Sequence, residues 1–595
     1  MSDIINRYKK LQKLAKLSSN VINEFGFLYF VNTAMMEFKK KGFSVFQPEL
    51  EQPEPEYSES HAYKTWIYKH VITNTSESKI REQIQAFSTK PNMLIVISVL
   101  KFDKNNLKKT IDSLKEQIYS NFEVHVFYSK SAKKDDEIVH ELSETSIKSK
   151  FKLETKSINE FLLAENYEFI IFIKSGDVLT KDALFRIADI INKVPDVDVI
   201  YSDVEQIDEN HNPFFKPDWA PDLFLSFDYI SNFYAVSMKL LKETHGFRQE
   251  FDNALHYDLL LRLTEITGKI VHIPIILASI DTTTNAVPHL SSVEADERKA
   301  LVDALKRRAI KGEVMDGKIR KSFRIRYALE REPKVSIIIP TKDQKTLLKR
   351  CLTSIQKRTS YRNYEIIIVD NNSEKEETSS YLKSLPHKVI RYDAPFNFSK
   401  INNMAATYAS GDYLLFLNDD TAILEPQWLT ELVSIGEQDN VGVVGPKLVL
   451  SNNVIQHAGI ALLKTGAAFH PFAGLDANDP GYFGFLNMTR NCSAVTGACL
   501  LVKKKLFEKV GGFDEIFDLY YQDVDLCLKI IKFGYKVVYT PYAVLLHEGS
   551  STIKKNMSSF FAVENHYQFY KKWSNLKTGD PFYNPNLGLN YKIST

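Results

Sequence analysis

The chain contains one structural pattern twice. Residues 335–373 begin with VSIIIPTKDQ and end with YEIIIVDNNS, and residues 93–131 begin with MLIVISVLKF and end with FEVHVFYSKS. Further on, GDYLLFLNDDTAI at 411–423 parallels NYEFIIFIKSGDVL at 166–179, and VGGFDEIF at 510–517 parallels THGFRQEF at 244–251. A chain of 595 residues is too long for one hydrophobic core. The repeat therefore predicts two similar domains.

Within each copy, short apolar runs alternate with amphipathic helical patterns, as in MLIVISVL, LKKTIDSLKEQI and FEVHVFY. This alternation is typical of βαβ units around a mostly parallel sheet, so we predict an α/β protein. The predicted organisation is a helical region at 1–90 with a Pro- and Glu-rich linker at 46–62, a first domain at 91–294, a helical connector at 295–332, and a second domain at 333–595 with an irregular tail that packs as a strap.

The composition excludes some classes of protein. A net charge of +2 carries no nucleic-acid-binding signature. The four cysteines form no CxxC pair, which favours buried free thiols in a reducing compartment. There is no signal peptide and no apolar run long enough to span a bilayer, so we expect a cytoplasmic protein. Residues 1–45 are basic with apolar positions at helical spacing, which fits either peripheral membrane contact or a helix docked on the first domain.

Acidic and amide side chains follow two buried strands of the second copy, where an open α/β sheet binds its ligands. Asp370 closes YEIIIVD and could accept from a nucleobase or a ribose, or it could cap the following turn. Asn418, Asp419 and Asp420 follow LLFL. Adjacent carboxylates repel each other, so the pair suggests a nearby cation, and oxygen ligands suit Mg²⁺ or Mn²⁺. An acidic turn in solvent is the alternative.

Two further signals lie later in the second copy. Asp523 and Asp525 stand at the start of a helix in QDVDLCLKI, where one of them could act as a general base. Negative charge is favoured at a helix N-terminus in any case. His547 follows another apolar strand and could contact a metal or a phosphate, although a single histidine is often structural. Together these residues fit sugar transfer from a nucleotide donor with a metal at the diphosphate.

The second copy resembles family 2 glycosyltransferases of the GT-A fold, and among them bacterial rhamnosyl- and galactofuranosyltransferase-like enzymes of surface polysaccharide synthesis. The matching segments, in order, are VSIIIPTKD, IIIVDNNS, FNFSKINNMAA, LLFLNDDT, HAGIAL, SAVTGACLLVKK, GGFDE, QDVDLCLK and His547. The first copy resembles the same superfamily. The resemblance implies two tandem GT-A domains and an inverting, metal-dependent transferase that builds an O-antigen- or capsule-type glycan.

The resemblance also implies roles for individual residues. Asp523 would be the catalytic base, and Asp420 and His547 would hold Mn²⁺ or Mg²⁺. A UDP- or dTDP-sugar donor would be bound by Thr341, Asp343, Asp370, Ser399, Lys400, Asn402, Asn418 and Asp419. A lipid-linked or oligosaccharide acceptor would lie near Gly497, Ala498 and Asp525. The sequence departs from the family pattern at Asn418, the first position of the DxD-like motif, and at Gln522, where the family has Glu.

The first copy has lost most of these groups. Its residues at the corresponding positions are Tyr128 for Asp370, Lys174-Ser175-Gly176-Asp177 for the acidic strand end, His256 for Asp523, Asp258 for Asp525, and Ser279 or Ile280 for His547. A lysine where a cation would bind predicts poor metal affinity, so we expect the first domain to be non-catalytic. Two alternatives remain: a bifunctional polymerase that uses both domains, and a nucleotide-sugar-binding scaffold without turnover. A dehydrogenase is disfavoured because no GxGxxG follows either first strand.

Overall fold

The computed structural model describes residues 59–99, 102–128, 149–152, 155–207, 212–231, 233–281, 290–548, 559–574 and 579–594. The predicted helix at 1–45 and most of the linker at 46–62 lie outside these residues. The described chain forms two compact units. The C-terminal unit comprises 329–479 and 492–580, and the N-terminal unit comprises 59–328 together with 480–491 and 581–594. Each unit is built on its own mixed sheet, which confirms the predicted α/β class.

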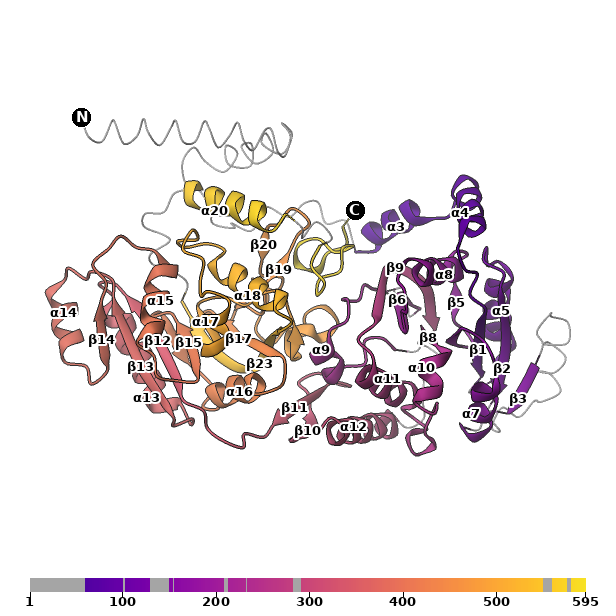
Figure 1. Cartoon of the computed structure of the whole chain (residues 1–595), viewed down its shortest axis with the longest axis horizontal. Coiled ribbons are helices and arrows are strands. Elements are labelled where there is room, and N and C mark those ends of the chain that lie inside the picture. Colours follow the sequence, from indigo (N-terminus) through magenta and orange to yellow (C-terminus); the bar gives the residue numbers. More distant parts are fainter. Residues whose placement is uncertain are drawn as a thin grey trace. The chain divides into compact units, whose positions relative to one another are not determined.

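The sheet of the C-terminal unit has a parallel half and a mixed half (Figure 1). Its strands run in the order β14 (Lys388–Arg391), β13 (Tyr364–Asp370), β12 (Val335–Thr341), β15 (Tyr413–Leu417), β22 (Cys499–Lys503), β17 (Val441–Val449), β23 (Lys536–His547) and β16 (Thr421–Ile423). The first four strands are parallel, whereas β22 is antiparallel to both its neighbours. The central strands β12, β15 and β17 are almost wholly buried, as expected for strands that are covered on both faces.

Helices cover both faces of this sheet. In Figure 1, α13 (Lys345–Arg358) and α16 (Trp428–Gly436) lie on one face, and α15 (Phe398–Thr407), α17 (Lys504–Lys509) and α18 (Gln522–Lys532) lie on the other. The unit also contains α14 (Glu376–Lys383), β18 (Ile455–His457), the hairpin strands β19 (Ala461–Leu462) and β20 (Ala468–Phe469), and α20 (Ser559–Lys572). All four cysteines are free and buried, as predicted.

The N-terminal unit repeats the same strand order. Its sheet runs β3 (Ser149–Lys152), β2 (Phe122–Tyr128), β1 (Met93–Val99), β4 (Phe169–Lys174), β8 (Tyr234–Ser237), β6 (Val199–Ile207), β9 (Ile270–Asp281) and β5 (Val178–Leu179), with β7 (Asn212–Phe214) beside β6. Its helices include α3 (Glu59–His70), α4 (Asn74–Ala86), α5 (Lys104–Lys115), α7 (Thr155–Ala164), α8 (Ala183–Lys193), α9 (Pro221–Ser226), α10 (Met238–Glu243), α11 (Leu255–Ile266) and α12 (Leu290–Arg307).

Strand register confirms the repeat residue by residue. Thr341 pairs with Asp370 at the end of β12 and β13, and Val99 pairs with Tyr128 at the end of β1 and β2. Tyr128 therefore stands where the C-terminal unit has Asp370. The structure differs from the prediction at the connector, 295–332, because helix α12 is followed there by the hairpin β10 (Gly312–Asp316) and β11 (Phe323–Tyr327). In FRIRY the apolar residues alternate with arginine, and this period of two is a strand pattern that the prediction overlooked.

The C-terminal tail, which the sequence analysis grouped with the second domain, belongs to the N-terminal unit. Asn584 is 3% exposed, and its Nδ2 donates to Asp203 Oδ1 at 2.9 Å and to the carbonyl of Lys216 at 2.8 Å. Asp203 is fully buried and also contacts Nε2 of His272 at 2.9 Å. A buried carboxylate needs such partners, so the tail completes the polar interior of this unit.

No helix in the described ranges combines the length and the apolar character needed to cross a bilayer.

Replacement of Asn584 by alanine should loosen the N-terminal unit alone. The change removes the amide donor from the buried carboxylate of Asp203, and such a loss costs about 1–3 kcal/mol. Hydrogen exchange should accelerate in β6 and β9 and stay unchanged in β12 and β15. Asn105→Ala, at an exposed position of α5, is the control. Equal acceleration in both sheets, or none in β6, would contradict this role of the tail.

Candidate active site

Two strand ends of the C-terminal unit bring Asp420 and His547 together. Asp420 lies in the turn between β15 and β16, and His547 ends β23. Strands β16 and β23 are antiparallel neighbours, and their register pairs Thr421 with His547. As a result, Oδ1 of Asp420 lies 3.2 Å from Nε2 of His547, and both residues are only 6% exposed. The structure thus assembles the two residues that were predicted to bind a metal.

The chemistry of this pair suits Mn²⁺ or Mg²⁺. Asp420 Oδ1 is buried and forms no hydrogen bond. Nδ2 of Asn418 lies 3.4 Å from Nε2 of His547, the ring nitrogen that faces Asp420, and Nδ1 of His547 is buried and forms no hydrogen bond. The described residues include no group of three or more His, Cys, Asp or Glu suited to a metal. Two protein ligands are enough where substrate phosphates complete the coordination of the ion.

Asp419 is tied to the neighbouring strand end. Its Oδ2 accepts a hydrogen bond of 2.6 Å from Oγ1 of Thr341, the last residue of β12. Burial and then the charge of Asp420 raise the pKa of Asp419 to about 7, although the hydrogen bond from Thr341 opposes the shift. Repulsion between these adjacent acids is relieved when a cation is nearby. The contact brings together two of the residues that were predicted to bind the donor.

Arg350 and Glu548 support the same strand ends, and the sequence analysis did not identify either of them. Arg350 on α13 donates to the carbonyl of Asp420 at 3.1 Å and to Oε1 of Glu548 at 2.9 Å. Glu548 follows His547 directly, so the ion pair fixes both strand ends in relation to α13. The only signal in the sequence was the position of Glu548 next to a candidate ligand.

Asp370 and Asp343 stabilise the loop that follows β13. Asp370 Oδ1 accepts from the backbone N–H of Ser373 at 2.9 Å, and Oδ2 accepts from Arg391 on β14. Asp343 Oδ1 accepts from the backbone N–H groups of Glu374 at 2.9 Å and Lys375 at 2.8 Å. Their assignment to the donor remains a prediction, and these contacts add a role in holding the loop.

The predicted donor residues on α15 have different environments. Ser399 and Asn402 are fully buried, and Ser399 Oγ donates to the carbonyl of Phe517 at 2.5 Å. Asn402 Nδ2 donates to the carbonyl of Phe398, whereas Lys400 is exposed. Ser399 therefore anchors the loop that leads to α18, and Lys400 has the most accessible side chain of the three. Their donor-binding role stays a prediction.

The candidate base, Asp523, is held at the first turn of α18. Its Oδ2 accepts from the backbone N–H of Gly497 at 2.7 Å, and its Oδ1 accepts from its neighbour Val524 at 2.9 Å. Burial raises the pKa of Asp523, although these backbone donors oppose the shift. At Gly497 a Cβ would lie 3.3 Å from the ring of Phe398 and 3.6 Å from Cβ of Asp523. Glycine thus allows the backbone to approach the carboxylate closely.

Backbone pairing connects the candidate base to the candidate metal-binding pair. The backbone N–H of Asn418 donates to the carbonyl of Ala498 at 3.0 Å, and Leu417 pairs with Cys499 across β15 and β22. Ala498 follows Gly497, which holds Asp523. The predicted pocket residues Gly497 and Ala498 therefore bridge the acidic strand end and the base.

Asp525, predicted to bind the acceptor, is instead surrounded by protein groups. It is fully buried, and its Oδ1 accepts from Nε1 of Trp573 at 2.9 Å and lies 2.7 Å from Nζ of Lys572. Lys529, one turn later in α18, lies 3.6 Å from Oδ2. The acceptor role remains a prediction, and the contacts favour a structural one: Asp525 binds α18 to the end of α20.

Helix α20 contacts the start of α18 through several other side chains. Tyr521, the residue before α18, has a left-handed backbone (φ 68°), and its hydroxyl lies 2.7 Å from Nδ1 of His566. Its ring stacks on Phe569 at 4.6 Å between centroids. Asn565 donates to Oδ1 of Asp518 at 2.8 Å. A strained residue persists only where its surroundings hold it, so α20 fixes the backbone from which Asp523 projects.

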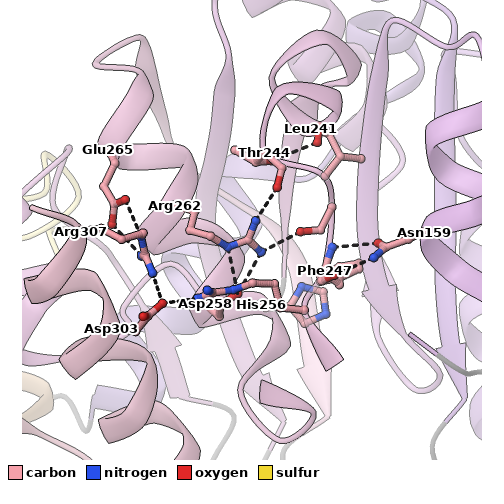
Figure 2. Close-up of polar contacts among 12 residues, drawn as sticks. Asn159, Leu241, Thr244, Phe247, His256, Asp258, Arg262, Glu265, Asp303 and Arg307 are labelled. Atoms are coloured by element: carbon pink, nitrogen blue, oxygen red, sulfur yellow. Dashed lines mark hydrogen bonds and ion pairs between the residues drawn. The ribbon is translucent and has the colours of Figure 1, made fainter. Parts of the chain in front are cut away.

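In the N-terminal unit, Asp258 stands at the position of Asp525 and is bound by arginines (Figure 2). Asp258 on α11 is fully buried and accepts from Arg262 at 2.9 Å and from Arg248. On α12, Asp303 and Arg307 extend this ion-pair network. Asp258 thus keeps the structural role of Asp525 with different cations.

His256, which stands where the C-terminal unit has Asp523, is enclosed by aromatic rings. The rings of Phe172 and Phe247 each lie 5.3 Å away between centroids, and the hydroxyl of Tyr234 contacts Nδ1 at 3.1 Å. Burial and then the charge of Lys174 lower the pKa of His256 to about 3. An effective general base has a pKa near the operating pH. His256 is therefore a poor base.

Comparison with known families agrees with this geometry. Residues 336–511 match the family model described as glycosyl transferase family 2, so the chain contains a family 2 glycosyltransferase domain. This confirms the resemblance to family 2 glycosyltransferases for residues 336–511, and the mixed sheet of the C-terminal unit is consistent with the GT-A fold that the resemblance implies. The matched segment includes β12, β15 and the acidic strand end.

The chain spans about half the length of the two curated relatives that it matches over most of its own length. It is 35% identical over 529 residues to the O-antigen biosynthesis protein RfbC of Myxococcus xanthus, a match that covers 86% of this chain and 41% of that protein. It is 32% identical over 540 residues to the uncharacterized protein y4gI of Sinorhizobium fredii, covering 86% of this chain and 59% of that protein. Among solved structures, GalNAc-T7 with UDP, GalNAc and Mn²⁺ is 18% identical with a TM-score of 0.35, covering 45% of this chain and 52% of that one.

Trp573→Phe should slow turnover with little effect on donor affinity. The change keeps an aromatic ring but removes the indole N–H that binds Asp525, so α18 and Asp523 lose part of their restraint. Small displacements of a catalytic group cost up to about a hundredfold in rate, and we expect a fall in kcat of about tenfold. Steady-state kinetics with varied donor would show this loss in kcat and an unchanged KM.

The matched control for this variant is Trp428→Phe. Trp428 also loses an indole hydrogen bond, to Oγ1 of Thr359 at 3.1 Å, but it lies on α16 and does not contact α18 in this way. Its kcat should stay near that of the wild type. Similar kcat losses in both variants would indicate general destabilisation and argue against positioning by α20.

Proposed function

We propose that this protein is an inverting, metal-dependent glycosyltransferase that moves a sugar from a nucleotide diphosphate donor to a growing surface polysaccharide. The C-terminal unit is its catalytic part. The observation that carries the proposal is the buried pair of Asp420 and His547, linked through Asn418 and Ala498 to the residue that holds Asp523. A family 2 domain covers the same residues, apart from Asp523 and His547.

The acceptor chemistry depends on Asp523. Its carboxylate takes the proton from an acceptor hydroxyl while the hydroxyl oxygen bonds to the anomeric carbon and the bond from that carbon to the diphosphate breaks. Attack from the side opposite the leaving group inverts the anomeric centre. The N–H groups of Gly497 and Val524 fix the direction of the carboxylate before the acceptor arrives.

Asp420 and His547 would hold Mn²⁺ or Mg²⁺, which supplies positive charge to the diphosphate when bound. Asp419 adds negative charge beside them, and its contact with Thr341 keeps it next to the end of β12. Thr341, Asp343, Asp370, Asn418 and the α15 residues Ser399, Lys400 and Asn402 remain the candidates for donor binding.

The N-terminal unit is proposed to be non-catalytic, with a role in acceptor binding or as a scaffold. Lys174 occupies the strand-end position of Asn418, and Tyr128 that of Asp370. His256 has too low a pKa for efficient proton abstraction. The alternative of a polymerase with two active units conflicts with all three substitutions.

The relatives support a proposal for the acceptor class. RfbC of M. xanthus is named for O-antigen biosynthesis, and a lipid-linked or oligosaccharide acceptor of the O-antigen or capsule type is the corresponding proposal here. Such acceptors lie at a membrane, so we propose that the protein works in the cytoplasm with peripheral membrane contact. UDP- and dTDP-sugars are the proposed donors.

Asp420→Asn should abolish sugar transfer. The amide is a weaker ligand for a hard cation, and the loss of metal charge at the diphosphate should reduce kcat/KM by about a hundredfold or more. Transfer from a panel of nucleotide sugars, with and without Mn²⁺, measures the effect. Asp177→Asn in the N-terminal unit is the matched control and should leave transfer intact. Survival of one linkage type in Asp420→Asn would support two active units.

The pH dependence of kcat/KM should show the titration of Asp523. The base acts only when ionised, so activity is lost as pH falls through its pKa. Because burial raises that pKa, the acidic limb should lie above about 3.9, the usual value for aspartate. Asp523→Asn should remove this limb and lower kcat by about 10²- to 10⁴-fold. An unchanged acidic limb in the variant would exclude Asp523 as the base.

A further inference from the structure

Two histidines of the C-terminal unit face each other, and the chemistry described above uses neither of them. His457 ends β18 and is fully buried, and His470 follows β20 and is partly exposed. Their Nδ1 atoms lie 2.9 Å apart. The hairpin β19–β20 follows β18 and returns the chain to it, so that residues 13 positions apart meet. A hydrogen bond between two imidazoles requires one donor and one acceptor.

The backbone determines which nitrogen of His457 carries hydrogen. The N–H groups of Gly459 and Thr496 point at Nε2 of His457, at 3.2 Å and 3.4 Å. Nε2 is therefore an acceptor, and the hydrogen of the neutral ring lies on Nδ1. His457 thus donates from Nδ1 to Nδ1 of His470.

The tautomer of His470 follows from that of His457. Its Nδ1 accepts, so the hydrogen of the neutral ring is on Nε2. Burial and then the charge of His547 lower the pKa of His470 to about 4, which keeps the ring neutral near pH 7. No hydrogen bond of Nε2 is found within the described ranges. His470 therefore presents an N–H donor, in a fixed tautomer, that is not used by the protein itself.

The contacts of His457 show which part of the unit the histidine pair adjoins. His457 accepts from the backbone N–H of Thr496, and the next residue, Gly497, holds Asp523. The charge of His547 is, after burial, a cause of the low pKa of His470. The histidine pair therefore lies beside the segment that holds the proposed base.

We propose that Nε2–H of His470 donates a hydrogen bond to a phosphate oxygen of the nucleoside diphosphate donor. This inference rests on the proposed function and adds a substrate-contacting residue to the same site. Hydrogen bonds to ionised oxygens are among the stronger ones, and a neutral donor adds no like charge beside the metal ion. Negative charge builds on the diphosphate as the sugar leaves, so the contact also strengthens in the transition state.

Two variants of His470 separate the contact of its Nδ1 with His457 from the proposed contact of its Nε2 with the phosphate. In His470→Asn the shorter amide can still accept from His457 but does not reach the position of Nε2. In His470→Gln the longer amide can place an N–H near that position. The probe is UDP or dTDP, whichever the wild type binds more tightly, titrated calorimetrically with Mn²⁺. We expect affinity to fall about 10- to 100-fold in His470→Asn and to be largely retained in His470→Gln.

The controls keep this inference distinct from the proposed function. His387→Asn, in the loop before β14, should bind nucleotide as the wild type does. If neither nucleotide binds, or if binding ignores both Mn²⁺ and Asp420→Asn, the proposed function is wrong. If Asp420→Asn weakens binding but His470→Asn does not, or if His470→Gln loses as much affinity as His470→Asn, only the role of His470 is overturned.

Discussion

The contact between Asp420 and His547 is the interaction on which the candidate site depends. Its two members are 127 positions apart in the sequence, and they meet because β16 turns back from β15 and pairs with the end of β23. Both side chains are nearly inaccessible to water, and Oδ1 of Asp420 has no hydrogen bond. A buried carboxylate in this state is costly unless a positive charge is close to it. Arg350 and Glu548 hold the two strand ends in place, so the pair proposed to bind the cation is fixed by the fold itself.

The two units share one fold but differ in whether they carry the acidic strand end. Both sheets have the same strand order, yet the strand end that carries Asn418, Asp419 and Asp420 in one unit carries Lys174 and its neighbours in the other. Asp525 in α18 has a counterpart in Asp258 of α11, and both carboxylates are buried and paired with cationic side chains. The retained acid therefore serves the fold, whereas the acids that differ are the ones suited to chemistry.

The proposed base, Asp523, is positioned from outside the sheet. Helix α20 and Trp573, which follows it, contact the loop before α18 and α18 itself through a ring stack, three hydrogen bonds and an ion pair with Asp525. On the opposite side, Ser399 and Asn403 of α15 bind the same loop through the carbonyls of Phe517 and Phe513. Asp523 thus projects from a segment restrained on both sides, and the N–H of Gly497 sets the direction of its carboxylate. Such pre-organisation reduces the cost of aligning the base with an acceptor hydroxyl.

The sequence alone determined the internal repeat, the α/β class, the family and the acidic strand end, because each of these depends on local periodicity or on ordered motifs. Asp420 and His547 were found as single residues at strand ends, and their assignment to one ligand pair came from the resemblance. Their contact required tertiary structure. Asp523 and Asp525 are two positions apart on one helix, and their spacing did not predict that they have separate roles. The roles differ because Asp525 is buried against the end of α20, whereas Asp523 keeps partial access to solvent. The hairpin β10–β11, the placement of the tail in the N-terminal unit and the histidine pair were likewise decided by contacts between distant segments. Local sequence encodes which side chains a strand carries, but only the packing of the whole chain sets which of them meet and which still reach water.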